Sequence, residues 1–173
     1  QVYTYWELCI ADDCSTDSQV RAFLERSMDL DKRINVIFRK ENEHISAASN
    51  SALTLVQGEW VAFMDQDDIL PKDALYWVVD AINTHPNSRL IYSDEDKVDE
   101  NGDRYARYFK CDWNLDLFYS QNMFSHLGVY HKPLLDEVGG FRVGFEGAQD
   151  YDLVLRCIEK ISHEQIIHIP RVL

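Results

Sequence analysis

Short apolar runs alternate with amphipathic stretches along the first half of the chain. The apolar runs predict buried strands at residues 6–11, 34–38, 60–64 and 90–93. Between them, apolar residues recur at helical spacing after residue 18, after Ser46, which suits an N-cap, and after Pro71, which suits a first helical turn. Short apolar strands separated by amphipathic helices predict an α/β domain with a largely parallel sheet.

The alternation ends in the second half of the chain. The run 94–103 contains six acidic residues and one lysine, and we expect a solvated loop with a turn at Asn101-Gly102. Residues 104–131 are aromatic-rich and irregular, with one short strand expected near their end. Periodicity returns at residues 150–160, which predict a helix, and residues 166–169 predict a last short strand.

The composition is that of a globular domain. A length of 173 residues suits one domain, and 4 Trp, 9 Tyr and 8 Phe exclude a disordered acidic segment. The formal net charge of −13 argues against a nucleic-acid binder, because such proteins present basic surface to phosphates. An anionic ligand therefore requires a cation that bridges the repulsion. No apolar run approaches the ~20 residues of a membrane span.

The cysteines and the start of the chain concern its cellular setting. The four cysteines form no Cys-x-x-Cys pair, so we expect reduced thiols in a cytoplasmic protein. The first residues lack the basic start and apolar stretch of a signal peptide. Because the chain begins almost inside a strand and without an initiator Met, we expect a fragment of something longer.

Two aspartate clusters follow predicted strands. Asp12 and Asp13 end the first strand, and Asp65, Asp67 and Asp68 follow the third. Ligands of parallel sheets sit at the carboxyl ends of strands, so both clusters are expected to face one crevice. Three carboxylates in four residues repel one another, and Mg²⁺ or Mn²⁺ bridging them to a phosphate would relieve the repulsion. The alternative is a solvated turn that caps the following helix.

Two further segments allow both a structural and a functional interpretation. Residues 12–17 can bind a nucleobase edge or a ribose, or form an Asx turn that leads into a helix. Asp150 opens the last predicted helix, where the helix dipole stabilises a carboxylate. That placement suits a helix cap, and it also suits a general base that must be ionised before it acts.

Five motifs in order resemble the family-two inverting glycosyltransferases with the GT-A fold. The family pattern is Asp-Asp-x-Ser-Thr-Asp, then Ser-x-Ala-x-Asn-x-Ala, Asp-x-Asp-Asp before a proline, Val-Gly-Gly-Phe-Arg, and Gln-Asp-Tyr-Asp-Leu. These motifs stand here at residues 12–17, 44–52, 58–71, 138–142 and 147–156. Residues 92–114 resemble the branch of rhamnosyltransferases and other O-antigen or capsule enzymes. The resemblance implies a Rossmann-like GT-A domain with a mainly parallel central sheet.

The resemblance also implies a role for each matched residue. The residues on the side of the nucleotide donor are Asp12, Asp13, Ser15, Ser46, Asn50, Asp65 and Asp68. Asp67, together with Asp65, is implied as the ligand of Mg²⁺ or Mn²⁺, and Asp150 as the catalytic base. Gly139 and Gly140 match a tight loop near the sugar. Trp113 is expected in the core rather than stacked on an acceptor sugar, and His168 is expected to be structural.

The implied reaction transfers a sugar from a UDP- or dTDP-sugar to a hydroxyl of a saccharide or lipid-linked acceptor, at the inner face of the membrane. Residues 1–94 are expected to bind the donor and residues 95–173 to supply the acceptor side and the base. The first strand and helix of the family and its C-terminal segment are expected to be missing. The alternatives are an inactive, truncated sugar-nucleotide-binding domain, a nucleotidyltransferase, and a phosphatase with an aspartyl nucleophile.

Overall fold

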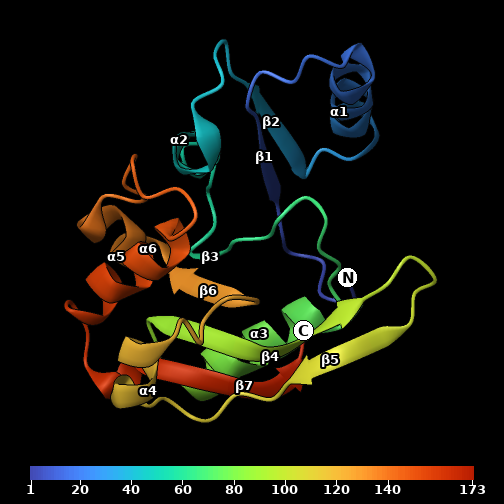
Figure 1. Ribbon diagram of the computed structural model, residues 1–173. Helices are drawn as coiled ribbons and strands as arrows, with labels where there is room; N and C mark the ends of the chain where they lie inside the picture. Colours follow the sequence, from blue (N-terminus) through green and yellow to red (C-terminus); the bar gives the residue numbers. More distant parts are fainter.

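The computed structural model describes residues 1–173, which form seven strands, six α-helices and one 3-10 helix (Figure 1). The first half contains β1 (Leu8–Asp12), α1 (Ser18–Leu30), β2 (Ile34–Phe38), α2 (His44–Leu53), β3 (Trp60–Ala62) and α3 (Ala74–Thr84). The second half contains β4 (Leu90–Val98), β5 (Arg104–Tyr108), α4 (Leu115–Ser120), β6 (Gly128–His131), α5 (Lys132–Val138), α6 (Gln149–Ile158), η1 (His163–Gln165) and β7 (Ile166–Val172). None of the helices is long and apolar enough to cross a membrane.

The strands form two sheets. β1 and β2 pair in parallel, and the other five strands form a sheet of order β3-β6-β4-β5, in which β7 also pairs with β4. β4 runs parallel to β7, but its pairings with β5 and β6 and the pairing of β3 with β6 are antiparallel. The predicted α/β fold is confirmed, whereas the mainly parallel sheet is corrected to a mixed one. The reason is that β6 enters the sheet from an irregular segment and not through a helical crossover.

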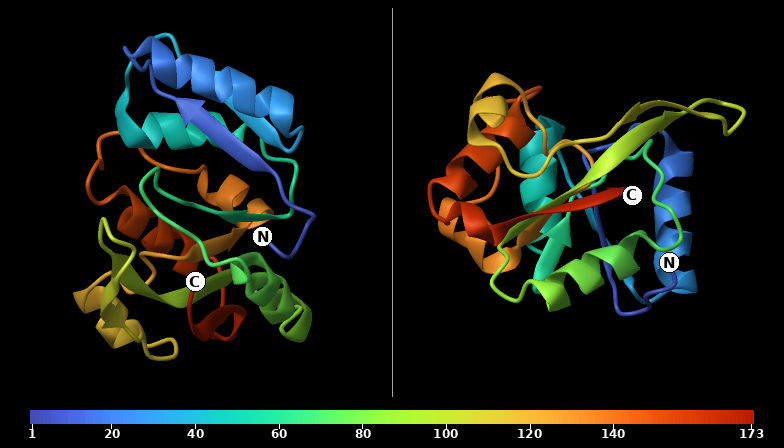
Figure 2. Two further views of the ribbon diagram at one scale, coloured as in Figure 1. Left: turned by 90° about the vertical axis from the view of Figure 1, so that its right-hand side faces the viewer. Right: turned by 90° about the horizontal axis from the view of Figure 1, so that it is seen from below.

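The β1–β2 pair lies between α1 and α2, which cover opposite sides of it (Figures 1 and 2). Glu7 connects this unit to the start of β3, because its Oε1 accepts the N–H groups of Gln57 and Gly58 at 2.6 and 2.8 Å. At the N-terminus, the N–H of Val2 donates to the carbonyl of Lys72 at 2.8 Å. These contacts hold the first two strands against the rest of the domain.

β4 is the centre of the core and is buried on both faces. Leu90 and Tyr92 join the cluster formed with α4, α5 and α6, whereas Ile91 joins the cluster under α3. All three side chains are 0% exposed. Successive strand side chains point to opposite faces, so burial on both faces requires the uninterrupted apolar run seen in the sequence.

Two local predictions are corrected by the structure. The acidic run 94–103 is not simply a solvated loop: its first half continues β4 as far as Val98, and Asp94 is only 3% exposed. The turn at Asn101-Gly102 is confirmed, with the Gly102 N–H donating to the Asp99 carbonyl at 3.0 Å. The second correction concerns Ser46, which lies inside the first turn of α2 and is not its N-cap, because the helix already begins at His44.

Candidate active site

The end of β1 forms a tight corner around Asp12 and Asp13. Asp12 is 9% exposed, and its Oδ1 accepts the N–H of Ser15 at 3.2 Å. The predicted Asx turn that leads into the helix is made by Asp17, the N-cap of α1, whose Oδ1 accepts the N–H of Gln19 at 2.8 Å. Asp13 forms an ion pair with Arg39 Nε at 2.8 Å and accepts the N–H of Glu43. Asp13 therefore connects the β1–α1 corner to the β2–α2 loop, while one carboxylate oxygen of Asp12 has no hydrogen bond within the protein.

α2 presents Ser46 and Asn50 to the segment before α6. The Asn50 side chain makes two hydrogen bonds with the backbone of Phe141: its Nδ2 donates to the carbonyl at 2.8 Å, and its Oδ1 accepts the N–H at 2.9 Å. Ser46 is fully buried beside Glu146. Asn50 thus joins two of the motifs that the sequence placed around the donor. Its own contact with a donor stays a prediction.

The aspartates after β3 form a turn next to His126. The Asp68 N–H donates to the Asp65 carbonyl at 3.2 Å, and His126 Nδ1 lies 3.3 Å from Asp68 Oδ2. One ligand atom from each of Asp65, Asp68 and His126 lies within 4.8 Å of the others. The predicted pair was Asp67 with Asp65, so the structure keeps Asp65 in the candidate cation site but joins it to Asp68 and His126, and Asp67 stays outside this group. Two carboxylate oxygens and an imidazole nitrogen are a donor set that suits a divalent cation.

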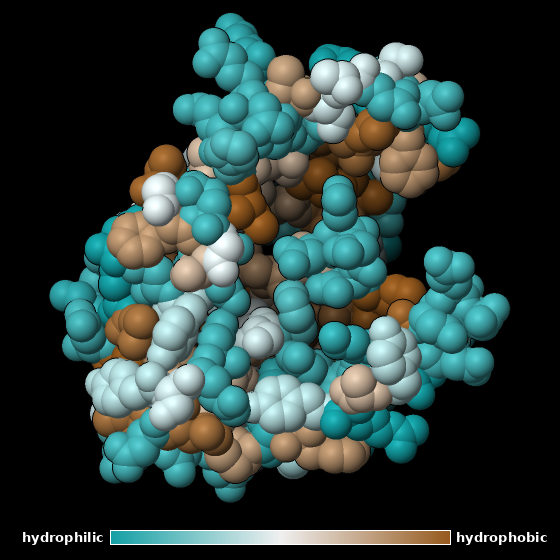
Figure 3. All heavy atoms as spheres, in the orientation of Figure 1, coloured by the Kyte–Doolittle hydropathy of each residue, from teal (hydrophilic) through white to brown (hydrophobic).

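The β3–α3 segment that carries these aspartates crosses the front of the molecule between the two sheets (Figure 1). In the same orientation, the space-filling view shows a hollow below the β1–β2 unit, with hydrophilic side chains at its rim and hydrophobic ones deeper inside (Figure 3). The candidate cation site is therefore open to solvent. This agrees with the exposure of the Asp68 and His126 side chains, 39% and 46%.

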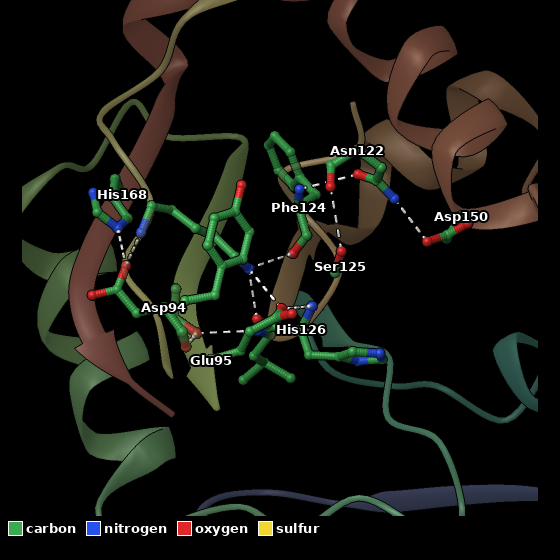
Figure 4. A network of polar contacts seen from close by, with 12 residues as sticks. Asp94, Glu95, Asn122, Phe124, Ser125, His126, Asp150 and His168 are labelled. Carbon is green, nitrogen blue, oxygen red and sulfur yellow. Dashed lines mark hydrogen bonds and ion pairs between the residues drawn. The ribbon is translucent and has the colours of Figure 1, made fainter. Parts of the chain in front are cut away.

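Asp150 lies in the first turn of α6, as predicted, and is held by a residue that the sequence did not indicate. Asn122 Nδ2 donates to Asp150 Oδ2 at 2.7 Å, and Asn122 Oδ1 accepts the N–H of Phe124 at 3.0 Å (Figure 4). The second bond fixes which way the Asn122 amide faces. Asp150 is half-buried and keeps its other carboxylate oxygen free of hydrogen bonds within the protein. A carboxylate at a helix N-terminus with one free oxygen can accept a proton.

Asp152, two residues further on, has a structural role. It is 7% exposed and forms ion pairs with Arg142 and Arg156. Burial raises the pKa of Asp152, but hydrogen bonds from the two arginines outweigh burial and leave the pKa below its usual value. Arg156 also donates to the carbonyls of Val138 and Gly140, both at 2.7 Å. The Asp152 group thereby fixes the loop that contains Gly139 and Gly140.

A buried lysine organises the segment between Asn122 and His126. The Lys110 side chain is 0% exposed, and its Nζ donates to Glu95 Oε2 at 2.9 Å and to the His126 carbonyl at 2.8 Å (Figure 4). Burial lowers the pKa of Lys110, and the hydrogen bond to Glu95 opposes that shift. Glu95 also accepts the N–H of His126 at 3.0 Å. No pattern in the sequence indicates this pair, because both residues lie in stretches that are predicted to be loop or irregular.

His168 and Trp113 have the structural roles that were expected. His168 stacks on Tyr92, with ring centroids 4.9 Å apart, and its Nε2 lies 2.9 Å from Asp94 Oδ1. Trp113 packs against Phe118 in the core, with ring centroids 5.1 Å apart. Neither side chain is assigned a role in the chemistry.

The fold defined by these elements is that of the GT-A glycosyltransferases. Staphylococcus aureus TarS, residues 1–349 in complex with UDP, matches with a TM-score of 0.76 at 21% identity over 96% of this chain and 49% of that chain. A mannosyltransferase of Pyrobaculum calidifontis in complex with GDP-Man and Mn²⁺ matches with a TM-score of 0.69 at 20% identity over 96% of this chain and 46% of that chain.

The Glycosyl transferase family 2 profile matches residues 1–147, and the chain belongs to that family. An uncharacterized protein of Sinorhizobium fredii, y4gI, is 53% identical over 173 residues, which are 100% of this chain and 19% of the relative. The O-antigen biosynthesis protein RfbC of Myxococcus xanthus is 36% identical over 162 residues, which are 94% of this chain and 13% of that protein. The chain therefore spans less than a fifth of the length of these curated relatives.

Proposed function

We propose that this chain catalyses inverting transfer of a sugar from a nucleotide-diphospho-sugar to an acceptor hydroxyl on a bacterial polysaccharide. The family membership and the O-antigen relative support the reaction class. The UDP complex of TarS supports a uridine donor, with a dTDP-sugar as the alternative. The GDP-Man and Mn²⁺ complex of the archaeal mannosyltransferase supports Mn²⁺ or Mg²⁺ as the cofactor.

The observation that carries the proposal is the segment from Asn122 to His126. At one end Asn122 holds Asp150, and at the other end His126 lies against Asp68. Four residue steps span at most about 14 Å between the Cα atoms of Asn122 and His126. The candidate base and the candidate cation site are therefore attached to one short segment, within reach of a single sugar nucleotide.

The residues of this chain divide the work between donor and acceptor. Asp12, with its free oxygen at the end of β1, would contact the nucleobase, with Asp13 and Ser15 completing the corner. Asp65 and Asp68 would hold a divalent cation, which when bound supplies a Lewis acid for the leaving diphosphate, and Asp67 as a further ligand stays a prediction of the sequence motif. The donor side lies in residues 1–94, and residues 95–173 supply the base.

Asp150 performs the proton transfer in this proposal. Its free oxygen accepts the proton of the acceptor hydroxyl, which attacks the anomeric carbon as the bond to the diphosphate breaks on the opposite face. A single displacement of this kind inverts the anomeric centre. Asn122 keeps the carboxylate oriented, and the N-terminal end of α6 favours its ionised form. A polysaccharide or lipid-linked acceptor at the cytoplasmic face of the membrane stays a prediction.

The test is Asp150→Asn assayed with a panel of UDP- and dTDP-sugars. General-base catalysis contributes about 10²–10⁴-fold, so transfer is expected to fall at least about 100-fold while donor binding by calorimetry is unchanged. Asp116→Asn makes the same substitution in the first turn of α4 and is expected to leave both unchanged. Equal loss of binding and transfer in Asp150→Asn would contradict the role of the base.

The products separate the alternative functions. Release of nucleoside diphosphate fits glycosyl transfer, whereas release of pyrophosphate would indicate a nucleotidyltransferase and release of inorganic phosphate a phosphatase. Donor binding without any transfer would indicate a non-catalytic sugar-nucleotide-binding domain.

A further inference from the structure

We propose that His126 is a nitrogen ligand of the divalent cation, together with Asp65 and Asp68, and that it gives the site a preference for Mn²⁺ over Mg²⁺. The inference rests on the proposed function, since it concerns the cation that would accompany the donor. It adds a residue from the second half of the chain to a site that the sequence motif places entirely in the first half.

The first support is the geometry of the three ligand atoms. Ligands bound at about 2.1 Å to one ion lie at most about 4.2 Å apart. His126 Nδ1 and Asp68 Oδ2 are 3.3 Å apart, and the ligand atoms of all three residues lie within 4.8 Å of one another. A closure of about half an ångström therefore suffices to bring them onto one cation.

The second support is the way His126 is held. Its N–H donates to Glu95 Oε2, and its carbonyl accepts from the buried ammonium of Lys110, at 3.0 and 2.8 Å. The next residue, Leu127, is 2% exposed and donates its N–H to Ser93 Oγ at 3.0 Å. The backbone of His126 is therefore fixed on both sides, and only the imidazole projects from this network toward the β3–α3 segment (Figure 4).

An isolated ion pair between His126 and Asp68 does not explain this arrangement well. An exposed ion pair contributes little to stability, whereas burying the Lys110 ammonium to fix the segment carries a desolvation cost. Asp65 adds a second carboxylate within 4.8 Å of the same imidazole and of Asp68, and two neighbouring carboxylates repel unless a cation lies between them. A cation bound by all three groups relieves that repulsion.

The chemistry of the three ligand atoms leads to the metal preference. Mg²⁺ prefers an octahedron of oxygens, whereas imidazole nitrogen is a common ligand of transition-metal ions. A site with oxygen ligands alone discriminates little between Mg²⁺ and Mn²⁺. Replacing one oxygen by His126 Nδ1 shifts the balance toward Mn²⁺.

The experiment measures metal binding directly on the full chain, with and without UDP. Loss of the electron paramagnetic resonance signal of free Mn²⁺ reports Mn²⁺ binding, and displacement of bound Mn²⁺ reports Mg²⁺ binding. His126→Ala is expected to weaken Mn²⁺ binding at least about tenfold and Mg²⁺ binding by less than about threefold. His85→Ala, which removes an exposed histidine outside the cluster, serves as the matched control and is expected to bind both ions as wild type.

A second variant separates ligation from folding. His126→Asn places an amide group close to the position of Nδ1, so it offers oxygen in place of nitrogen. It is expected to bind Mg²⁺ as wild type and to lose the preference for Mn²⁺. Circular dichroism of each variant shows whether the fold is retained.

Three results would overturn the inference. The first is a wild-type affinity for Mn²⁺ in His126→Ala, and the second is an equal loss of affinity for Mn²⁺ and Mg²⁺ in the Ala and Asn variants. The third is no Mn²⁺ binding by the wild type with UDP present. Failure of the proposed function has a different signature. In that case Mn²⁺ binds with the expected dependence on His126, but no nucleotide sugar is consumed.

Discussion

A methyl group added at Gly140 tests how the loop before α6 is held against α2. Gly140 has a φ of +67°, and a Cβ at this position would lie 2.5 Å from Asn50 Oδ1. That oxygen already accepts the N–H of Phe141, and the same amide donates to the Phe141 carbonyl. Gly139 also has a positive φ of +77°, but a Cβ there meets nothing within 4 Å. Gly140→Ala and Gly139→Ala therefore differ in the clash and share the backbone strain.

The expected losses in the free energy of unfolding follow from the backbone strain and from the clash with Asn50. Forcing an alanine into the left-handed region costs about 1–2 kcal/mol, and this applies to both variants. In Gly140→Ala the Asn50 amide must also move, which breaks two hydrogen bonds that contribute about 0.5–1.5 kcal/mol each. We expect the free energy of unfolding to fall by about 1–2 kcal/mol in Gly139→Ala and by about 2–5 kcal/mol in Gly140→Ala.

Urea denaturation followed by tryptophan fluorescence measures both losses. The same pair of substitutions is then made in an Asn50→Ala background, where the clashing oxygen is absent. The two glycine variants are expected to differ there by less than about 0.5 kcal/mol, as for non-interacting sites. Equal losses in the wild-type background, or a difference that persists without Asn50, would refute the steric argument.

Three further outcomes are expected. Lys110→Met should lower the free energy of unfolding by about 3–5 kcal/mol, because it leaves Glu95 without its buried partner, whereas Lys32→Met on the surface should cost less than about 1 kcal/mol by the same urea titration. Because the folded-state pKa of Asp152 is lowered, its stabilisation is complete above about pH 4 and is lost as the pH falls through the folded pKa. The stability difference between wild type and Asp152→Asn should therefore shrink as the pH falls below about 4, and a constant difference would contradict it. Removal of divalent ions by EDTA should weaken UDP binding in calorimetry and leave the urea midpoint of the nucleotide-free chain unchanged.

The sequence predicted the first half of the fold better than the second. Up to residue 93, each strand is mostly apolar and each helix has apolar residues at helical spacing, so local periodicity carries the information. β5 was missed because most of its residues are exposed and its only partner is β4. α4 and α5 have 6 and 7 residues, too few for a helical period to stand out. Their stability comes from contacts with the core, which the order of residues does not reveal.

The residues of the candidate site show the same difference between the two halves of the chain. The positions of Asp12, Asp65 and Asp150 at the ends of strands or the start of a helix follow from the alternation of elements. Asn122 and His126 could not be found in this way, because they lie in an irregular segment whose partners are 28 residues away for Asn122 and 31 for His126. Such pairings depend on the tertiary fold, and a lysine or an asparagine in a polar stretch looks like ordinary surface.

The distribution of ion pairs indicates how a chain with a net charge of −13 would bind the proposed anionic donor. The carboxylates that support the fold are paired with cationic side chains: Asp13 with Arg39, Glu95 with Lys110, and Asp152 with two arginines. Apart from Asp13, the carboxylates assigned to donor, cation and acceptor have no arginine or lysine partner; they are Asp12, Asp65, Asp67, Asp68 and Asp150. A diphosphate that approaches these groups meets uncompensated negative charge, so a bound cation has to supply the attraction. Since the paired carboxylates do not depend on that cation, its removal is expected to cost nucleotide affinity and not the stability of the fold.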